Sequence, residues 1–528
     1  MEAAFALASL VLLLALVAVR WSRRLGLPSL LLYLGIGLLL GNRGLGIDFG
    51  GTAATTRLTE QLGLAALVFI LAEGGLTTRW SVVRPALGLG VAMATVSVVV
   101  SIGVAGAGVK LLLGSALGLD WRTSLLWGAV LSSTDAAAVF SVLRGVGVKS
   151  RLAAALELES GLNDAPVVIT VLLLAGETAL SWTDPLLIGY ELLAGAVIGL
   201  GVGRVGAWWL RRGALPATGL YPLATLALVG GAYAAGQFAH ASGFLATYVA
   251  AVVLGNSRLP HRAATLSFAE GFGWLAQIGL FVLLGLYVDP AELPAALLPG
   301  ALIGLLVLLV ARPLSVLAAA LPFRIPWREQ VFLSWSGLRG AVPIVLALIP
   351  LLIRADDTSR RLLNIIVVVV VIYTLLQGTT LPRVGRRLGV VQDGQPFEIE
   401  VEAAPLEEMH AQVLQVRIPP ESRMHGVYLA QLRLPAGAVV SLVLRAGTPI
   451  PLDPTVRLQG GDQLLVVTPE RVRAATERRL QAVSRGGALV GWFTDVGQGG
   501  SRGAGRGGGR GGGRARRNPD RRGRSGRD

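Results

Sequence analysis

The stretch LESGLNDAP at 158–166 places an unusual set of polar side chains within an apolar run. Glu159, Ser160, Asn163 and Asp164 stand there among leucines, alanines and valines. On a helix, Glu159 and Asn163 are four residues apart, as are Ser160 and Asp164, so the two pairs form adjacent stripes on one side. Polar groups in such surroundings are costly unless they are paired or used. The pattern therefore predicts a buried site that handles an ion or a proton.

Four more charged residues fall within apolar stretches of the chain. They are Glu73 in FILAEGGL, Asp135 in LSSTDAAAV, Arg312 in VLLVARPLSV and Arg339 in SWSGLRGAVPIV. A charge at the centre of a membrane helix costs about 2.5–3.5 kcal/mol on insertion scales. Left unpaired, six such charges would cost more than the net stability of most proteins. We therefore expect these side chains to face one another or water.

Two of the charged positions lie where a helix is expected to be interrupted. Thr134 and Asp135 follow two serines and precede three alanines, and small or hydroxylated residues suit a locally opened helix. Gly337, Gly340 and Pro343 surround Arg339 and predict a second interruption. Paired broken helices in the two halves of a transporter indicate an ion site near the middle of the membrane.

Each position also has a structural interpretation. Glu73 precedes two glycines near the predicted end of a helix, where an acid can snorkel to water or cap the helix. Asp135 could cap a helix end, and Asp164 could be a buried structural acid. The spacing and the position within a span favour a functional role for both aspartates. Glu159 and the two arginines are better explained as counter-ions.

The elements that must position these residues are membrane helices. Of the 528 residues, 53% are hydrophobic and only 15% are charged, and the absence of Cys excludes disulfides and thiolate chemistry. Apolar stretches of spanning length recur up to about residue 382 and predict an all-α polytopic membrane domain over 1–389. Thirteen spans are expected, at about 3–20, 28–41, 61–78, 86–113, 123–143, 152–177, 186–210, 218–237, 241–255, 265–288, 294–321, 329–353 and 362–382.

Loop charges predict how the chain crosses the membrane. Alternate loops are rich in arginine and lysine, and the loops between them are poor in basic residues or carry acids. The positive-inside rule then places the N-terminus outside and the C-terminal part in the cytoplasm. Arg354, Arg360 and Arg361 are exceptions, offset in part by two neighbouring aspartates.

Beyond residue 390 the composition changes. Short strand-like runs divided by Gly and Pro, followed by RVRAATERRLQAV, predict a small α+β cytosolic domain over about 397–485. The Gly/Arg-rich segment 486–528 has almost no apolar residues to bury and is expected to be disordered. Much of the net charge of +15 lies in this tail and in membrane loops, so no specific nucleic-acid partner is expected.

Three motifs together resemble a known family. STDAAAVFSVL, ESGLNDAPVVI and GLRGAVPIVLA are similar to the motifs of NhaP-type monovalent cation:proton antiporters of bacteria. The segment MHGVYLAQLRLPAGAVVSLVLRAGTPIPLDPTVRLQGGDQLLVV resembles the TrkA C-terminal regulatory domain. The resemblance implies thirteen helices with two crossed, interrupted helices, and a core domain that moves against a dimerising domain. Inverted six-helix repeats are a hypothesis, since no strong internal similarity is visible.

The resemblance also implies roles for the ion-binding residues. Asp164 would carry either a proton or a cation. Asp135, Thr134 and Ser160 would complete the oxygen shell of the cation. Asn163 would help to hold that arrangement.

The remaining motif residues would support the site. Glu159 would pair with Arg312, and Arg339 would offset the carbonyl dipoles where the broken helices cross. Glu73 matches an acid of the third span whose role is less defined.

The expected function is therefore secondary transport in the bacterial cytoplasmic membrane. K⁺ is favoured over Na⁺ as the ion exchanged for H⁺, by alternating access and with electroneutral stoichiometry. The resemblance implies a homodimer, and a nucleotide-type regulator of 397–485 is a hypothesis; no cofactor and no enzymatic activity are expected. Two other classes of protein are alternatives. A cation channel regulated by the TrkA-like domain is disfavoured because the sequence has no carbonyl filter motif. An intramembrane protease is disfavoured because the sequence has no HExxH motif.

Overall fold

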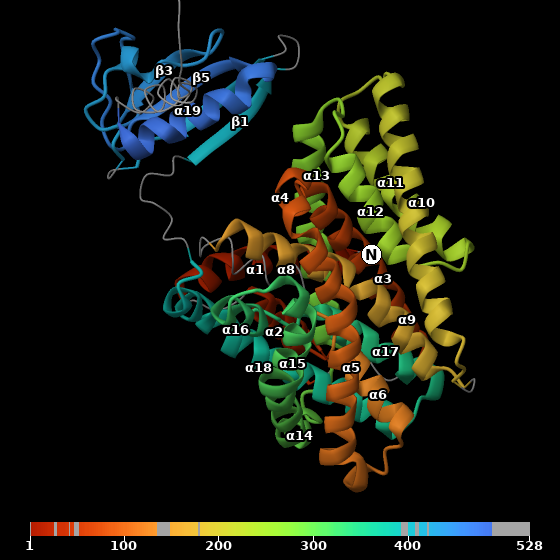
Figure 1. The fold of residues 1–528 in the computed structure, drawn as a ribbon. Coiled ribbons are helices and arrows are strands. Elements are labelled where there is room, and N and C mark those ends of the chain that lie inside the picture. The colour runs from red at the N-terminus through yellow and green to blue at the C-terminus, as the bar shows by residue number, and fades with distance from the viewer. Residues whose placement is uncertain are drawn as a thin grey trace, which may run out of the picture. The chain divides into compact units, whose positions relative to one another are not determined.

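The computed structural model describes residues 2–25, 29–41, 43–46, 52–134, 148–177, 180–391, 400–406, 411–419 and 422–487. The chain divides into two compact units, Met1–Gly394 and Gln395–Asp528. The first unit is helical, and the second is built on a small β-sheet (Figure 1).

Apolar helices make up the first unit. Eight helices among the described residues are long and apolar enough to cross a membrane, and α2, α12 and α17 are shorter apolar helices. Each predicted span contains at least one helix, which confirms the all-α membrane fold; the number of crossings stays a prediction. The helices are α1 (Glu2–Leu25), α2 (Ser29–Leu40), α3 (Ala53–Thr77), α4 (Trp80–Val83), α5 (Leu87–Leu117), α6 (Trp121–Val130), α8 (Ser150–Leu162), α9 (Asp164–Ala175), α10 (Asp184–Arg212), α11 (Leu220–Phe238), α12 (Gly243–Gly255), α13 (Arg262–Tyr287), α14 (Leu293–Leu306), α15 (Arg312–Ala320), α16 (Trp327–Trp335), α17 (Ala341–Arg354) and α18 (Asp357–Leu388), with short turns η1 (Arg84–Ala86), η2 (Val307–Ala311) and η3 (Leu321–Phe323).

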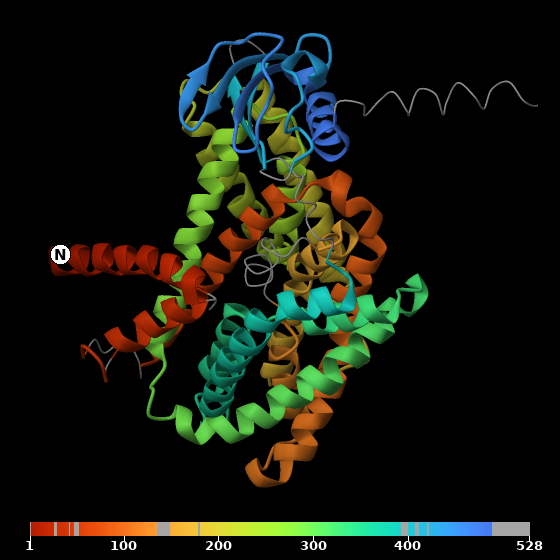
Figure 2. The same ribbon diagram turned by 90° about the vertical axis from the view of Figure 1, so that its left-hand side faces the viewer.

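The helices pack in two groups. In one group, α10, α11 and α12 lie side by side, and α12 and α13 both pack against α3 (Figure 1). In the other, α5 packs against α6, α8 and α15, and α18 packs against α14 and α17. α1 contacts α2 and projects away from the remaining helices (Figure 2). The groups meet where α3 contacts α17 and where α12 contacts α8 and α9.

Small residues allow α2 and α13 to cross closely. A Cβ added to Gly37 of α2 would lie 2.2 Å from the carbonyl oxygen of Val282 in α13, and one on Gly285 of α13 would lie 2.3 Å from that of Leu34. Lipid tails offer helices no hydrophobic driving force toward each other, so close van der Waals packing of this kind holds membrane helices together.

One helix break and one helix end near the expected interruptions lie in the second group. The helices α16 and α17 are separated by a non-helical segment from Ser336 to Gly340, which confirms the interruption predicted around Arg339. Helix α6 ends at Val130, and Leu131–Thr134 are not helical. Residues 135–147, which include Asp135, lie outside the described residues.

Prolines account for two further irregularities. Asn163 separates α8 from α9, and Pro166 three residues later lacks the N–H that would bond the carbonyl of Leu162. The π-helical turn η2 directly precedes Arg312 and Pro313. Such π-turns are frequent at functional sites.

A capped acid marks the start of α6. Asp120 is the N-cap residue, and its Oδ1 accepts a hydrogen bond of 2.9 Å from the backbone N–H of Thr123. The hydrogen bonds from Thr123, with the charge of Arg354, hold the pKa of Asp120 below its ordinary value against the opposing effect of partial burial. The acid is therefore ionised at neutral pH.

The second unit contains one antiparallel sheet. Its strands are β1 (Glu400–Leu406), β2 (Ala411–Arg417), β3 (Val439–Arg445), β4 (Thr448–Ile450) and β5 (Gln463–Pro469), in the order β1-β2-β5-β3-β4. Helix α19 (Arg473–Gly486) contributes Leu480 and Val483 to a core with strand residues that include Leu414 and Val466. The predicted small α+β fold is confirmed. Residues 488–528, which make up nearly all of the predicted disordered tail, lie outside the described residues.

Candidate ion-binding site

Asp164 is the buried carboxylate at the centre of the candidate site. It is the first residue of α9, directly after the kink at Asn163, and only 4% of its surface is exposed. The hydroxyl of Ser133 donates a hydrogen bond of 2.9 Å to Asp164 Oδ1. The non-helical segment after α6 therefore meets the kinked α8–α9 helix at this acid.

Asn163 makes a second link between the same two segments. Its Nδ2 donates to Thr134 Oγ1 at 2.5 Å, and it also lies 3.5 Å from the carbonyl oxygen of Thr134. Thr134 is thus placed next to the Asn-Asp pair. Ser160 is buried one turn before Asp164, and the hydroxyl that bonds Asp164 Oδ1 belongs to Ser133. Asp135 lies outside the described residues.

Arg339 connects the break between α16 and α17 to the segment that follows α6. This arginine lies between α16 and α17, is 1% exposed, and donates through Nη1 to the carbonyl oxygen of Ser133. The carbonyls after the last turn of α6 have no intrahelical partners and carry partial negative charge. A buried guanidinium is a suitable partner for such carbonyls.

Glu159 and Arg312 form a buried ion pair. Arg312 Nη2 lies 2.9 Å from Glu159 Oε2, and Nη1 donates to Oε1, so the contact is bidentate. Arg312 also donates to the carbonyl oxygen of Leu333 in α16 at 3.2 Å. The two residues are 2% and 4% exposed, and their mutual neutralisation makes their burial tolerable.

Gly337 makes room for this pair. A Cβ at position 337 would lie 2.6 Å from Arg312 Nε and 3.0 Å from Cζ. The break between α16 and α17 therefore does two things: it exposes carbonyls, and it lets the guanidinium approach the backbone. The π-turn before Arg312 sets the helical position from which the arginine reaches α8.

Glu73 lies apart from these contacts. It is half-buried on α3, one turn before the helix ends at Thr77. Its side chain runs along α13, where a Cβ added to Gly273 would be 3.1 Å from Glu73 Oε2. The next residue, Gly74, lines the cavity described below.

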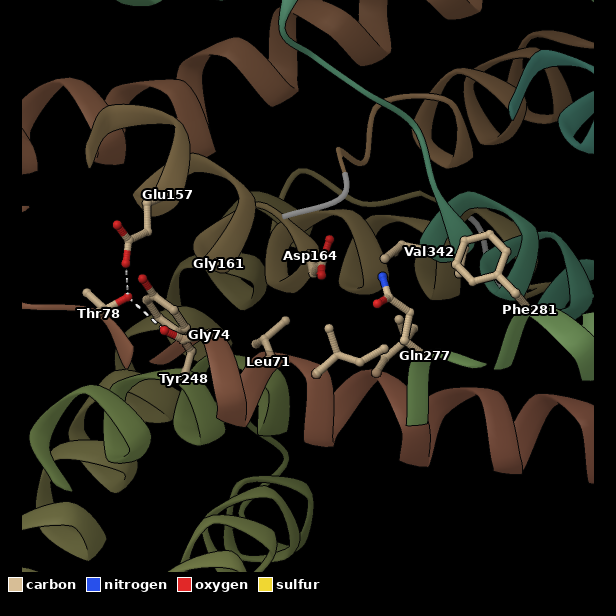
Figure 3. Close-up of a pocket in the computed structure, with 13 residues that line it drawn as sticks. Leu71, Gly74, Thr78, Glu157, Gly161, Asp164, Tyr248, Gln277, Phe281 and Val342 are labelled. Carbon is tan, nitrogen blue, oxygen red and sulfur yellow. Dashed lines mark hydrogen bonds between the residues drawn. The ribbon is translucent and has the colours of Figure 1, made fainter. Parts of the chain in front are cut away.

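A cavity opens beside Asp164 at the boundary between the two helix groups. It has a volume of about 30 Å³ and lies between α3, α8, α9, α12, α13 and α17. Figure 3 shows Asp164 in the middle of this cavity, with Glu157 and Thr78 toward one end and Gln277 and Phe281 toward the other. Most of the wall is apolar, so the few polar groups control what enters.

Several of these groups were not singled out in the sequence. Glu157 lies seven residues before Asp164, about two helical turns, so the two acids share one face of the helix. That spacing was a usable signal. Ser133 could be found only as one of several hydroxyl residues near Asp135. Tyr248 and Gln277 carry no clear sequence signal, because neither belongs to a motif of charged or regularly spaced polar residues.

The arrangement suits reversible ion binding. Carboxylate, hydroxyl and carbonyl oxygens are ligands for hard cations, and a carboxylate binds a proton instead of a cation. The nearby charges are already paired, Glu159 with Arg312, while Arg339 is bonded to a carbonyl. Asp164 is the buried acid that accepts from Ser133 and also lines the cavity.

Comparisons with known proteins agree with this geometry. The profile of the family "Sodium/hydrogen exchanger, transmembrane" matches residues 9–387, and the TrkA-C domain profile matches residues 413–481. The chain is 39% identical over 383 residues to the K(+)/H(+) antiporter NhaP of Alkalimonas amylolytica, which covers 71% of this chain and 65% of that protein. It is 34% identical over 462 residues to the K(+)/H(+) antiporter NhaP2 of Shewanella baltica, covering 85% and 78%.

A solved structure shares the fold. The sodium proton antiporter MjNhaP1 of Methanocaldococcus jannaschii superposes with a TM-score of 0.60 at 22% sequence identity. The match covers 74% of this chain and all of that chain. The likeness at this identity concerns the arrangement of helices.

Proposed function

The chain belongs to the family of transmembrane sodium/hydrogen exchangers, which are transporters rather than enzymes, and we propose that it exchanges K⁺ for H⁺ by competition of the two ions for Asp164. The observation that carries the proposal is the position of Asp164: buried, bonded by Ser133, and facing the cavity between the two helix groups.

The mechanism follows from the cost of moving charge. An ionised, empty Asp164 would carry an uncompensated charge across a low-dielectric barrier, whereas a bound proton or cation neutralises it. The helix group that holds Asp164 then crosses between its two orientations only when the site is occupied. Thr134, Ser160 and Asp135 are proposed to supply further oxygen ligands to the cation, and Asn163 to position Thr134.

The fixed pair of Glu159 and Arg312 sets the stoichiometry. Because their charges cancel, one exchangeable charge remains at Asp164, and exchange of one cation for one proton is electroneutral. Arg339 is proposed to neutralise the carbonyls at the break after α6. Glu73, which lies along α13, is proposed as an accessory acid near the cavity.

K⁺ is the favoured cation because the two relatives at 39% and 34% identity are named K(+)/H(+) antiporters. Na⁺ is the second candidate, since both ions take oxygen ligands and selectivity depends on cavity size and on the field strength of those ligands. A titration with each ion decides between them.

The assembly and location are proposed on the family likeness and the loop charges. We place the protein in the bacterial cytoplasmic membrane as a homodimer, with the N-terminus outside and the TrkA-C domain in the cytoplasm. Residues 397–485 are proposed as a regulatory domain for a nucleotide-type ligand, and 486–528 as a disordered tail.

Proton flux in proteoliposomes tests the proposal. Wild-type protein should move protons in response to K⁺ across pH 6.5–8.5, and Asp164→Asn should abolish the response while the protein still folds. Asp357→Asn is a matched control, because Asp357 is exposed in the first turn of α18 and should tolerate the same change. Exchange retained by Asp164→Asn would refute the assignment.

A further inference from the structure

A second carboxylate faces the cavity that holds Asp164. Glu157 of α8 is half-buried, and its Oε1 accepts a hydrogen bond from the hydroxyl of Thr78, at the end of α3. The same hydroxyl lies 2.8 Å from the carbonyl oxygen of Gly74. Figure 3 shows Glu157, Thr78 and Gly74 together at one end of the cavity.

A buried hydroxyl is aimed at the same place. Tyr248 of α12 is 4% exposed, and its OH lies near the Thr78 hydroxyl without a hydrogen bond of ordinary geometry to any described residue. Its ring lies against Gly161, where an added Cβ would be 2.4 Å from Tyr248 Cε2. Burying an unpartnered hydroxyl is costly, so an ordered water is the expected partner at this end of the cavity.

Glu157 of α8 and Asp164, the first residue of α9, lie on the same side of the α8–α9 segment. They are seven residues apart, which corresponds to about 10 Å of helix and returns to nearly the same face. Both line one continuous cavity. Glu159, only two residues from Glu157, points to the opposite side of α8 and forms an ion pair with Arg312.

The end of the cavity at Glu157 is the basic side of the membrane unit. Helix α3 ends one residue before Thr78 and is followed by Arg79, and α8 begins directly after Lys149. Helix α12 ends at Gly255, where Asn256 donates to the carbonyl oxygen of Thr78 at 2.8 Å. These ends adjoin the basic loops that the positive-inside rule assigns to the cytoplasm.

From these contacts we infer that Glu157 is a proton relay between the cytoplasm and Asp164. The inference rests on the proposed function. In the uptake direction, a Glu157 carboxyl gives its proton to water in the cavity, and that water gives a proton to a carboxylate oxygen of Asp164 as the cation leaves. The negative charge passes from Asp164 to Glu157, which is then reprotonated from the cytoplasmic side, so the site has taken up one proton from the cytoplasm for each cation released.

The groups that face Glu157 fit this role. Thr78 from α3 donates to the carboxylate, Tyr248 from α12 holds the polar end of the cavity, and Arg79 is the cation close enough to influence it. One cation, one hydroxyl bond and partial access to water leave the carboxylate able to take up and release a proton. A relay of this kind works through one water where donor and acceptor are not in direct contact.

The substitution Glu157→Gln distinguishes a role in proton transfer from a purely structural role of the hydrogen bond with Thr78. Glutamine keeps an oxygen that accepts from Thr78, so the link between α3 and α8 remains, but it cannot carry a proton. We expect K⁺-driven exchange in proteoliposomes to fall at least about tenfold at pH 8.5, where protons are scarce, and by less than about twofold at pH 6.5, where they reach Asp164 without a relay. Glu157→Asp keeps a carboxylate and should retain most of the alkaline activity.

The control is Glu191→Gln, a half-buried glutamate of α10 outside the lining of this cavity, which should leave the pH profile unchanged. A Glu157→Gln profile equal to the wild type, or lowered by the same factor at every pH, would overturn the relay. Loss of alkaline activity in Glu157→Asp equal to that in Glu157→Gln would do the same. Failure of the proposed function is a different result, because it appears as exchange that survives Asp164→Asn.

Discussion

The ion pair of Glu159 and Arg312 offers a quantitative test of how charge is accommodated in the membrane unit. Each partner is at least 96% buried, and two guanidinium nitrogens meet two carboxylate oxygens. Removing one partner of such a pair costs about 3–5 kcal/mol, because the other charge stays buried without compensation. Removing both charges leaves two polar but neutral groups, and costs much less.

The measurement is a double-mutant cycle. Glu159→Gln and Arg312→Gln should each lower the free energy of unfolding by about 3–5 kcal/mol, and the double variant should lose less than either single variant. SDS-induced unfolding of the purified protein in mixed micelles gives these free energies. The coupling energy should then be at least about 3 kcal/mol.

The two single variants should differ in how their stability depends on pH. In Arg312→Gln, protonation can neutralise the stranded Glu159, so stability should be recovered in part on going from pH 8 to pH 5.5. In Glu159→Gln, the stranded arginine stays charged at both pH values, and no recovery is expected. A double variant destabilised by the full sum of the single losses, with a coupling energy below about 1 kcal/mol, would refute this account of the pair.

Two further predictions concern close packing and the second unit. Gly337→Ala should destabilise the membrane unit by about 1–3 kcal/mol, because the new Cβ overlaps Arg312 Nε, whereas Gly279→Ala, whose Cβ would meet nothing within 4 Å, is the neutral control. An equal effect of both alanines would contradict the steric reason. Arg445→Met should strand Asp462, which is fully buried and accepts two hydrogen bonds from Arg445 at 2.9 and 2.8 Å. Amide exchange in β5 should speed up by about a hundredfold, while Arg473→Met, which breaks a partly exposed ion pair, should change it by less than about threefold. A hundredfold change in both variants, or in neither, would contradict the burial argument.

Hydrophobic patterning was sufficient to predict the membrane unit and its helices. Apolar length is a local property, so the spans from α1 to α18 could be placed from residues alone. The same holds for the break near Arg339, where Gly337, Gly340 and Pro343 disfavour a continuous helix. The strands of the second unit could also be predicted from local sequence patterns. The strand-like run at 436–450 forms two strands, β3 and β4, joined by a tight turn.

The partners of the charged residues depended on the tertiary structure. The i,i+4 spacing placed Ser160 and Asp164 on one side of a helix, and the structure adds Ser133, 31 residues away in the chain, as a hydroxyl partner of Asp164. Helical spacing states which side chains share a face; it does not state which neighbouring helix that face meets.

Glu157 illustrates the same division. By itself, this chain determined that a membrane protein would bury acids in its spans, because insertion of each charge demands a use or a partner. Only the packing of α3, α8 and α12 decided that Glu157 would share a cavity with Asp164 while Glu159, two residues later, would face Arg312. Contacts between helices far apart in sequence arise from the complementarity of whole surfaces, and no local pattern of residues encodes them.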